Sequence, residues 1–246
     1  MIAKSLKRAE KQSQIATSKV HSSGQSGVLV FLGVLFTIIL AGLDNTIVST
    51  VMPVALPELG GAHLYAWTFA AYMLAAAVSM PIWGPGSDRW GRRRTYLIGI
   101  VAFTVGSGLC AVARTMMEFI AARAVQGIGA GAIATLPFVL LGVVYPPNKR
   151  GKALGAAASS WAVASVAGPL LGTLIVTHVS WRWAFLINVP IAIVAAFLVI
   201  AGMRESIGHS VGRFDFAGAL LAGAGGSCLM WAFVDLGERQ IGLMQA

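Results

Sequence analysis

The chain has 246 residues, of which 57% are hydrophobic and only 11% are charged. An ordinary soluble domain carries roughly 25% charged residues, so this chain has too few polar side chains to cover a soluble globule. The composition excludes most soluble enzymes and nucleic-acid-binding domains, and it indicates a protein that lies in lipid. The net charge of +9 fits the excess of Lys and Arg in the cytoplasmic segments of membrane proteins.

Long apolar runs predict helices that cross the membrane, because about 20 apolar residues are needed to span the hydrocarbon. The runs are continuous, whereas the strands of a membrane barrel alternate between apolar and polar residues. We therefore expect an all-α integral membrane protein. The expected spans cover residues 28–50, 64–84, 96–113, 117–143, 152–177, 183–203 and 215–234.

The basic residues predict the orientation. Residues 1–27 form a basic, polar tail that we expect to be disordered and cytoplasmic, since the apolar run after it is too long for a cleaved signal peptide. We also expect a cytoplasmic linker at 204–214, and an outer tail that follows the seventh helix within 215–246. The basic residues on the inner side are then Lys4, Lys7, Arg8, Lys11, Lys19, Arg89, Arg92, Arg93, Arg94, Lys149, Arg150, Lys152, Arg204 and Arg213, against Arg114, Arg182 and Arg239 outside. This asymmetry predicts a multi-pass protein of the cell membrane with a cytoplasmic N-terminus.

The segment between the second and third spans reads GPGSDRWGRRR from residue 84 to residue 94. A basic cytoplasmic loop needs no such spacing of glycines and an acid. The segment resembles the GxLaDrxGrrxxl signature of the major facilitator superfamily of transporters. The resemblance implies a gating loop that bridges helices and stabilises the outward-open state, formed by Gly84, Asp88, Arg89, Gly91 and Arg92.

Two charged residues lie inside predicted spans, Asp44 in the first and Arg123 in the fourth. Ionisable residues within a membrane are costly and are functional by default. The alternatives are that Asp44 caps a shortened helix and that Arg123 reaches out to the interface. Each lies about six residues from the outer end of its span, roughly 9 Å deep at 1.5 Å per residue, so we expect the two to meet.

Two strings, LDNTIV from Leu43 and WRWAFLINVP from Trp181, resemble signatures of one branch of that superfamily, the fourteen-helix drug:proton antiporters. RAVQGIGAG from Arg123 resembles a motif of the superfamily, and GPLLG from Gly168 resembles its antiporter motif, which accompanies exporters. The resemblance implies that Asp44 and Arg123 couple transport to protons. It also implies close helix packing at Gly127, Gly131, Gly168, Pro169 and Gly172, although a plain packing face with a proline kink would explain the last three. Trp181 and Trp183 are further expected in an aromatic belt at the outer interface.

The resemblance implies a six-helix half-bundle of two inverted three-helix repeats over 28–203, followed by the seventh helix. No second half follows in this sequence, and three interpretations stay open: a truncated gene product, a fragment, or one half that needs a complementary C-terminal half as a partner. The expected substrate cavity lies among spans one, two, four and five. Its candidate residues are Tyr72, Gln126 and Trp161; aromatic residues at such positions also serve simply to pack helices.

The expected function is multidrug efflux by proton antiport, with lipophilic or cationic small molecules as substrates and the lipid bilayer as the medium. The histidines are scattered, and no catalytic, phosphate-binding or metal-binding motif is present, so we expect neither an enzyme nor a cofactor, metal or nucleic-acid site. The proton gradient is then the energy source. The alternatives are an uptake carrier of the same fold for another small solute and an inactive membrane fragment.

Overall fold

The computed structural model describes residues 23–204 and the isolated positions 218, 221, 224–226, 228, 231 and 232. The predicted tail up to residue 22, nearly all of the predicted linker, and the predicted seventh helix apart from those positions lie outside the described residues.

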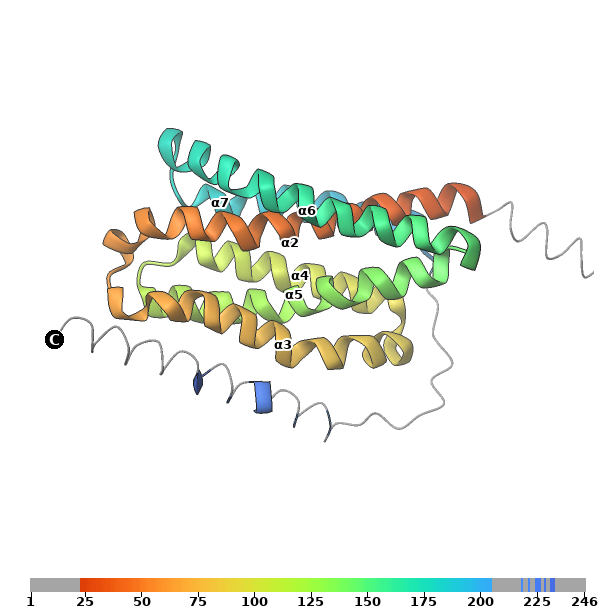
Figure 1. Cartoon of the computed structure of the whole chain (residues 1–246), viewed down its shortest axis with the longest axis horizontal. Coiled ribbons are helices and arrows are strands. Elements are labelled where there is room, and N and C mark those ends of the chain that lie inside the picture. The colour runs from red at the N-terminus through yellow and green to blue at the C-terminus, as the bar shows by residue number, and fades with distance from the viewer. Residues whose placement is uncertain are drawn as a thin grey trace, which may run out of the picture.

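The described chain is helical, without a strand between residues 23 and 204, and six helices are long and apolar enough to cross a membrane. This confirms the predicted all-α class. The helices are α2 (Ser23–Leu59), α3 (Tyr65–Trp90), α4 (Arg92–Val112), α5 (Met116–Val144), α6 (Pro147–His178), and the pair α7 (Trp183–Leu186) and α8 (Asn188–Gly202), which together form the sixth span; a short 3-10 turn, η1 (Ala62–Leu64), precedes α3 (Figure 1).

The first span is longer than predicted. The prediction that it ends near residue 50 is wrong, because α2 continues through Pro53 and Pro57 to Leu59. A proline inside a helix costs roughly 3 kcal/mol. Packing offsets this cost, since α2 buries an apolar face in this stretch that consists of Val51, Met52, Ala55 and Leu59. Two glycines with positive φ, Gly60 and Gly61, then end the helix.

The segment predicted to be a gating loop is mostly helical, which corrects that expectation. Helix α3 runs to Trp90 and α4 starts at Arg92, so Gly91 alone separates them. Gly91 has φ +97°, a left-handed backbone conformation that glycine adopts without a steric penalty. The motif therefore forms two helix ends joined by a one-residue turn.

The packing of the helices has the pattern of an inverted repeat. Helix α2 packs mainly on α6 and α8, and α5 packs mainly on α3 and α4 (Figure 1). If the first three spans are exchanged for the last three, α2 takes the place of α5, α3 that of α6 and α4 that of α8. Each major contact then maps onto another, as two three-helix repeats require.

Glycines of α5 allow its close contacts with α3 and α4. A methyl group at Gly127 would collide with the backbone of Tyr72 in α3, and one at Gly131 would collide with Ser79 in the same helix. A methyl group at Gly129 would instead strike the backbone of Phe103 in α4. The alternating glycines therefore serve two interfaces, as small residues do in membrane helices.

The α2–α6 interface uses the other predicted packing motif. A methyl group at Gly168 would collide with Thr46 of α2, and one at Gly172 would lie 3.2 Å from Cβ of Thr50. Pro169 lies beside Gly168 within α6 but is exposed. Gly168 and Gly172 thus allow α6 to approach α2 closely.

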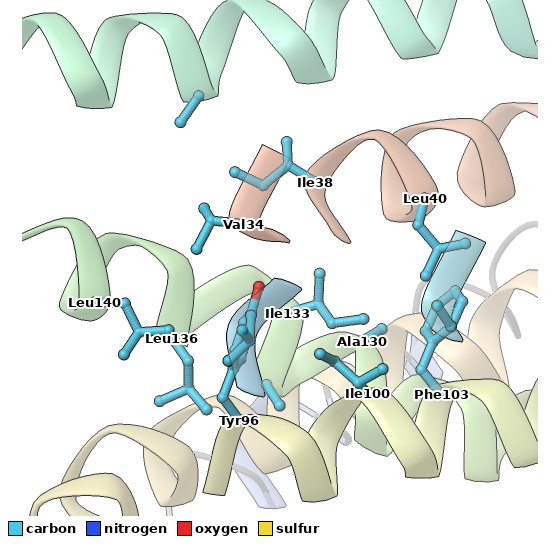
Figure 2. Packing of buried hydrophobic residues seen from close by; sticks show 14 of the residues in the cluster. Val34, Ile38, Leu40, Tyr96, Ile100, Phe103, Ala130, Ile133, Leu136 and Leu140 are labelled. Atoms are coloured by element: carbon cyan, nitrogen blue, oxygen red, sulfur yellow. The ribbon is translucent and has the colours of Figure 1, made fainter. Parts of the chain in front are cut away.

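Buried apolar residues form two separate clusters along the bundle. The first, shown in Figure 2, contains Val34, Ile38, Tyr96, Ile100, Phe103, Ile133, Leu136 and Leu140. The second contains Ile47, Val51, Met52, Cys110, Met116, Phe119, Trp181 and Phe185. On α2, α4 and α5 the sequence passes from one cluster to the other through a short polar stretch, which places a polar layer between two apolar ones.

Candidate functional site

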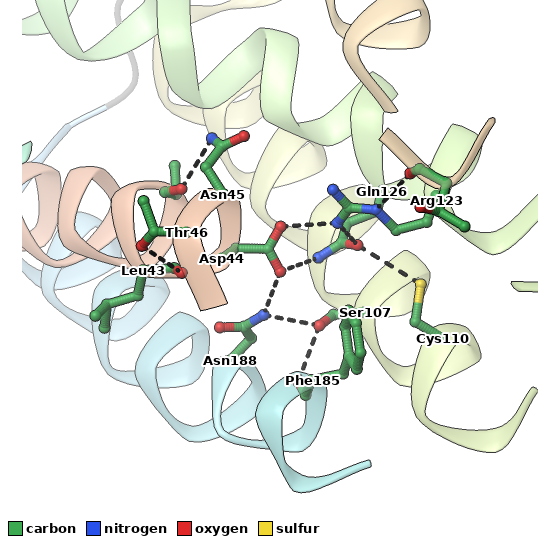
Figure 3. Close-up of polar contacts among 12 residues, drawn as sticks. Leu43, Asp44, Asn45, Thr46, Ser107, Cys110, Arg123, Gln126, Phe185 and Asn188 are labelled. Carbon is green, nitrogen blue, oxygen red and sulfur yellow. Dashed lines mark hydrogen bonds and ion pairs between the residues drawn. The ribbon is translucent and has the colours of Figure 1, made fainter. Parts of the chain in front are cut away.

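The polar layer is centred on the carboxylate of Asp44 (Figure 3). Arg123 Nη1 donates to Oδ2 at 2.9 Å, and Gln126 Nε2 and Asn188 Nδ2 donate to Oδ1 at 2.7 and 2.9 Å. The Asp44 and Arg123 residues are each 1% exposed. The expected pair therefore forms, although Asp44 lies 15 residues before the end of α2 rather than six.

The guanidinium of Arg123 is surrounded by partners of several kinds. Nη1 also donates to Gln126 Oε1 at 2.7 Å, and Nε donates to the carbonyl of Thr68 at 3.3 Å. Its central carbon lies 3.9 Å from the ring centroid of Tyr72, a cation–π contact. Arg123 is thus fully enclosed by protein, which excludes the alternative of an arginine that reaches the interface.

A second ring of hydrogen bonds supports the first. Asn188 Nδ2 also donates to Ser107 Oγ at 2.9 Å, and Ser107 Oγ donates to the carbonyl of Phe185 at 2.9 Å. The thiol of Cys110 lies 3.6 Å from Gln126 Oε1. Neither Ser107 nor Asn188 was among the predicted site residues. A polar residue within an apolar run marks Asn188, whereas Ser107 in a glycine-rich stretch carries little signal.

The site connects most of the bundle. Its hydrogen bonds join α2, α3, α4, α5, α7 and α8, and the apolar clusters on either side keep water from it. A buried charge is tolerated only with a partner and satisfied hydrogen bonds, and removal of one partner costs about 3–5 kcal/mol. Loss of the charge of either Asp44 or Arg123 would therefore leave the other charge buried without a partner and destabilise the protein.

A cavity of about 410 Å³ lies next to this site, among α2, α3, α5 and α6. These are the four spans that the sequence predicts. Tyr72 and Trp161 line the cavity, together with Asn45 and Met73. Gln126 does not line it, which corrects that expectation, because its side chain is fully buried and bonded to Asp44 and Arg123.

Tyr72 connects the cavity to the ion pair. Its ring belongs to the cavity wall and also lies against the guanidinium of Arg123. The residue is 4% exposed, whereas Trp161 is 49% exposed. A ligand in the cavity would therefore touch a ring that contacts Arg123, so the position of the ligand and that of the ion pair can influence each other.

The predicted gating residues lie at one end of the bundle. Arg92 at the start of α4 donates through Nη2 and Nε to Oδ1 of Asp88 at 2.8 and 3.1 Å, which joins α4 to the end of α3. Arg89 is exposed, and Gly84 lies within α3. The Asp88–Arg92 contact bridges two consecutive helices; the gating role of the group stays a prediction.

The opposite end holds a third ion pair. Arg182 Nη1 and Trp181 Nε1 donate to Oε2 of Glu58 at 2.6 and 3.0 Å, which ties the end of α2 to the turn before α7. The expectation that Trp181 lies in an interfacial belt is wrong. Trp181 is 1% exposed, because its ring packs against Phe119 and Phe185 while its indole N–H donates to the exposed carboxylate of Glu58.

Among the described residues no group of three or more His, Cys, Asp or Glu could hold a metal ion. The chemistry of the site therefore rests on one carboxylate, one guanidinium and the amides around them.

Comparison with known proteins decides the family. Residues 34–215 match the model of the Major Facilitator Superfamily. The chain belongs to this superfamily. Its members are membrane transporters, in agreement with the six apolar helices, and the chain is a multi-pass membrane protein.

Relatives within the superfamily include exporters. The chain is 42% identical over 210 residues to Multidrug resistance protein 3 of Bacillus subtilis, covering 85% of this chain and 41% of that protein. It is 37% identical over 199 residues to the Efflux pump FUS6 of Gibberella moniliformis, covering 78% of this chain and 35% of that protein. The chain thus spans less than half the length of these relatives.

A solved structure supports the fold. The xylose transporter XylE from Escherichia coli superposes with a TM-score of 0.65 at 18% sequence identity, covering 88% of this chain and 59% of that one. At this identity the likeness shows the fold of a major facilitator half-bundle and says nothing about the substrate.

Proposed function

We propose that the chain forms the N-terminal half of a proton-coupled multidrug exporter of the fourteen-helix branch. The observation that carries the proposal is the buried Asp44–Arg123 pair beside an apolar cavity, at 2.9 Å and 1% exposure. The names of the relatives, a multidrug resistance protein and an efflux pump, support export rather than uptake. A complementary C-terminal half is the proposed partner, and neither an enzymatic reaction nor a cofactor is part of the proposal.

Proton coupling follows from the two charged groups. While Arg123 lies against Asp44, the carboxylate stays charged, because its charge is balanced. If rocking of the helices separates them, the buried carboxylate without its counter-ion takes up a proton, since an isolated buried charge is costly. Alternating separation and return would load and release one proton per cycle. The proton gradient would thereby drive export.

The cavity suggests lipophilic substrates. Most of its lining is Ala, Ile, Met and Phe, and no charged residue takes part. The exposed indole of Trp161 offers a face on which a flat aromatic or cationic compound can stack. One face of Tyr72 is already occupied by Arg123. Trp161 is therefore the stronger candidate for contact with a cationic substrate.

The arrangement of basic residues supports the proposed orientation in the cell membrane. The α3–α4 and α5–α6 turns lie at the end of the bundle where α2 begins, and the other turns lie at the opposite end (Figure 1). The end of the bundle where α2 begins holds the α3–α4 turn, the α5–α6 turn and the end of α8, and it carries Arg89, Arg92, Arg93, Arg94, Lys149, Arg150, Lys152 and Arg204. The opposite end carries Arg114 and Arg182. By the positive-inside rule, the end of the bundle where α2 begins faces the cytoplasm.

The test is a chimaera in which the matching segment of Multidrug resistance protein 3 is replaced by this chain. The 42% identity over 210 residues makes the two bundles exchangeable in principle. In an efflux-deficient cell the chimaera should extrude ethidium, and a protonophore should abolish extrusion. Inward accumulation of a solute would favour the uptake carrier. A chimaera that reaches the membrane but moves nothing would favour an inactive fragment.

A further inference from the structure

A groove opens at the end of the bundle that carries the basic turns. It has a volume of about 320 Å³ and lies where α5 passes into α6, beside the N-terminal part of α2. Phe31, Tyr145, Lys149, Lys152 and Ala153 line it. It is separate from the cavity beside Asp44, with which it shares no lining residue.

The charge of the groove is unbalanced. Lys149 and Lys152 are three residues apart on α6 and therefore share one face of the helix. Ion pairs of the described residues involve Asp44, Asp88 and Glu58, and none of them reaches these lysines.

Arg150 adds a third positive charge on the same helical turn. Its Nη2 lies 3.5 Å from the carbonyl of Tyr145, which is a weak contact, and its buried Nε has no hydrogen-bond partner. A buried donor without an acceptor is unfavourable. An anion bound at this turn would balance the positive charge of the three basic residues.

One side of the groove is apolar. The rings of Phe31 and Tyr145 meet edge to face with centroids 6.0 Å apart. Burial raises the pKa of Tyr145, so its phenol stays protonated and remains a hydrogen-bond donor. On α2, Val28 lies one turn before Phe31 on the same face, and Leu32 follows Val28 by four residues; both Val28 and Leu32 are exposed. The groove therefore leads from a basic rim onto an aliphatic surface.

We propose that this groove binds an anionic phospholipid, with the head-group phosphate at Lys149 and Lys152 and an acyl chain along Val28 and Leu32. Basic pockets at the ends of membrane helices are suited to phosphate head groups, since charge attraction and apolar contact act together. A soluble phosphate ester would use the lysines but gain nothing from the aliphatic surface. The site is independent of the transported substrate.

The test measures lipid retention by the full chain in detergent with native mass spectrometry. Phosphatidylglycerol is the probe, phosphatidylcholine is the neutral lipid, and glycerol 3-phosphate is the soluble competitor. The variant Lys149→Gln/Lys152→Gln removes both charges from exposed positions without disturbing the core. The matched control Lys4→Gln/Lys7→Gln changes the net charge equally at the start of the chain.

The wild-type chain should retain one phosphatidylglycerol, and the groove variant should retain it at least tenfold more weakly. The control should stay within twofold of the wild type, and phosphatidylcholine should not be retained. Equal losses in the groove variant and the control would overturn the proposal, as would equal retention of the two lipids. Displacement of the lipid by an equal concentration of glycerol 3-phosphate would assign the groove to soluble phosphate instead.

Discussion

Asn188 of α8 and Gln126 of α5 donate hydrogen bonds to the same oxygen of Asp44, at 2.9 and 2.7 Å, while Arg123 binds the other oxygen at 2.9 Å. Asn188 thus holds the carboxylate through a bond that does not involve the guanidinium, whereas Gln126 also accepts from Arg123 Nη1 at 2.7 Å. Arg123 can then leave without the carboxylate rotating. This arrangement suits a site in which Arg123 moves away from Asp44 while the carboxylate itself stays in place.

Asn188 is accordingly expected to stabilise the fold through its bond to the carboxylate. Asn188→Leu keeps the size of the side chain but removes its donor, and a hydrogen bond to a charged group contributes about 1.5–3 kcal/mol. The free energy of unfolding in detergent should therefore fall by about 1.5–3 kcal/mol. Asn148→Leu, at an exposed position of α6, should leave the free energy of unfolding nearly unchanged. Equal stability of the two variants would contradict a supporting role of Asn188.

Arg123 is expected to be needed for folding stability unless its partner is also neutralised. Arg123→Met leaves Asp44 charged and buried, which should lower the free energy of unfolding by about 3 kcal/mol. The double variant Arg123→Met/Asp44→Asn should recover much of this loss, because no unpaired charge remains. Denaturant unfolding in detergent provides the measurement. Losses that simply add would show that the two residues are not coupled.

The close helix contacts at glycines predict that a Gly→Ala substitution lowers the stability of the protein only where the glycine touches a neighbouring helix. Gly129→Ala places a methyl group against the backbone of Phe103 and should destabilise the protein by about 1–3 kcal/mol. Gly142→Ala lies on the same helix with open space around it, so it should be neutral or slightly stabilising. Thermal unfolding of both variants compares them directly. Equal stability of the two would contradict the close α4–α5 contact.

The orientation can be tested with reporters that are active only in the cytoplasm. Fusions after Arg94 or Lys152 should be active, because both positions belong to the basic end of the bundle. A fusion after His178, at the end of α6, should be inactive. Activity after His178 would reverse the orientation that the basic residues indicate.

The sequence predicts the helices and the central pair well, for physical reasons that are local. Continuous apolar runs require spanning helices, and two charges inside such runs require each other, which is why Asp44 and Arg123 could be paired in advance. The glycines of α5 could likewise be assigned to packing, although their division between α3 and α4 emerges only from the three-dimensional arrangement.

Other features depend on long-range contacts and could not be predicted. The continuation of α2 through Pro53 and Pro57 depends on packing of its buried face, which outweighs proline's local preference. Trp181 is buried against Phe119, and its indole N–H bonds to Glu58, a residue 123 positions away in the chain. Ser107 and Asn188 enter the site only because α4 and α8 meet beside Asp44.

The most direct test of proton coupling is Asp44→Asn in the chimaera, with Glu118→Gln as the control. Both changes replace a carboxylate by an amide, but Glu118 lies in the exposed first turn of α5, where it accepts from the backbone N–H of Arg114. We predict that Asp44→Asn abolishes ethidium efflux driven by the proton gradient, while ethidium binding survives and loses its pH dependence, and that Glu118→Gln behaves as the unmodified chimaera. Proton-driven efflux by the Asp44→Asn variant at the rate of the unmodified chimaera would contradict coupling through Asp44 and leave the ion pair with a purely structural role.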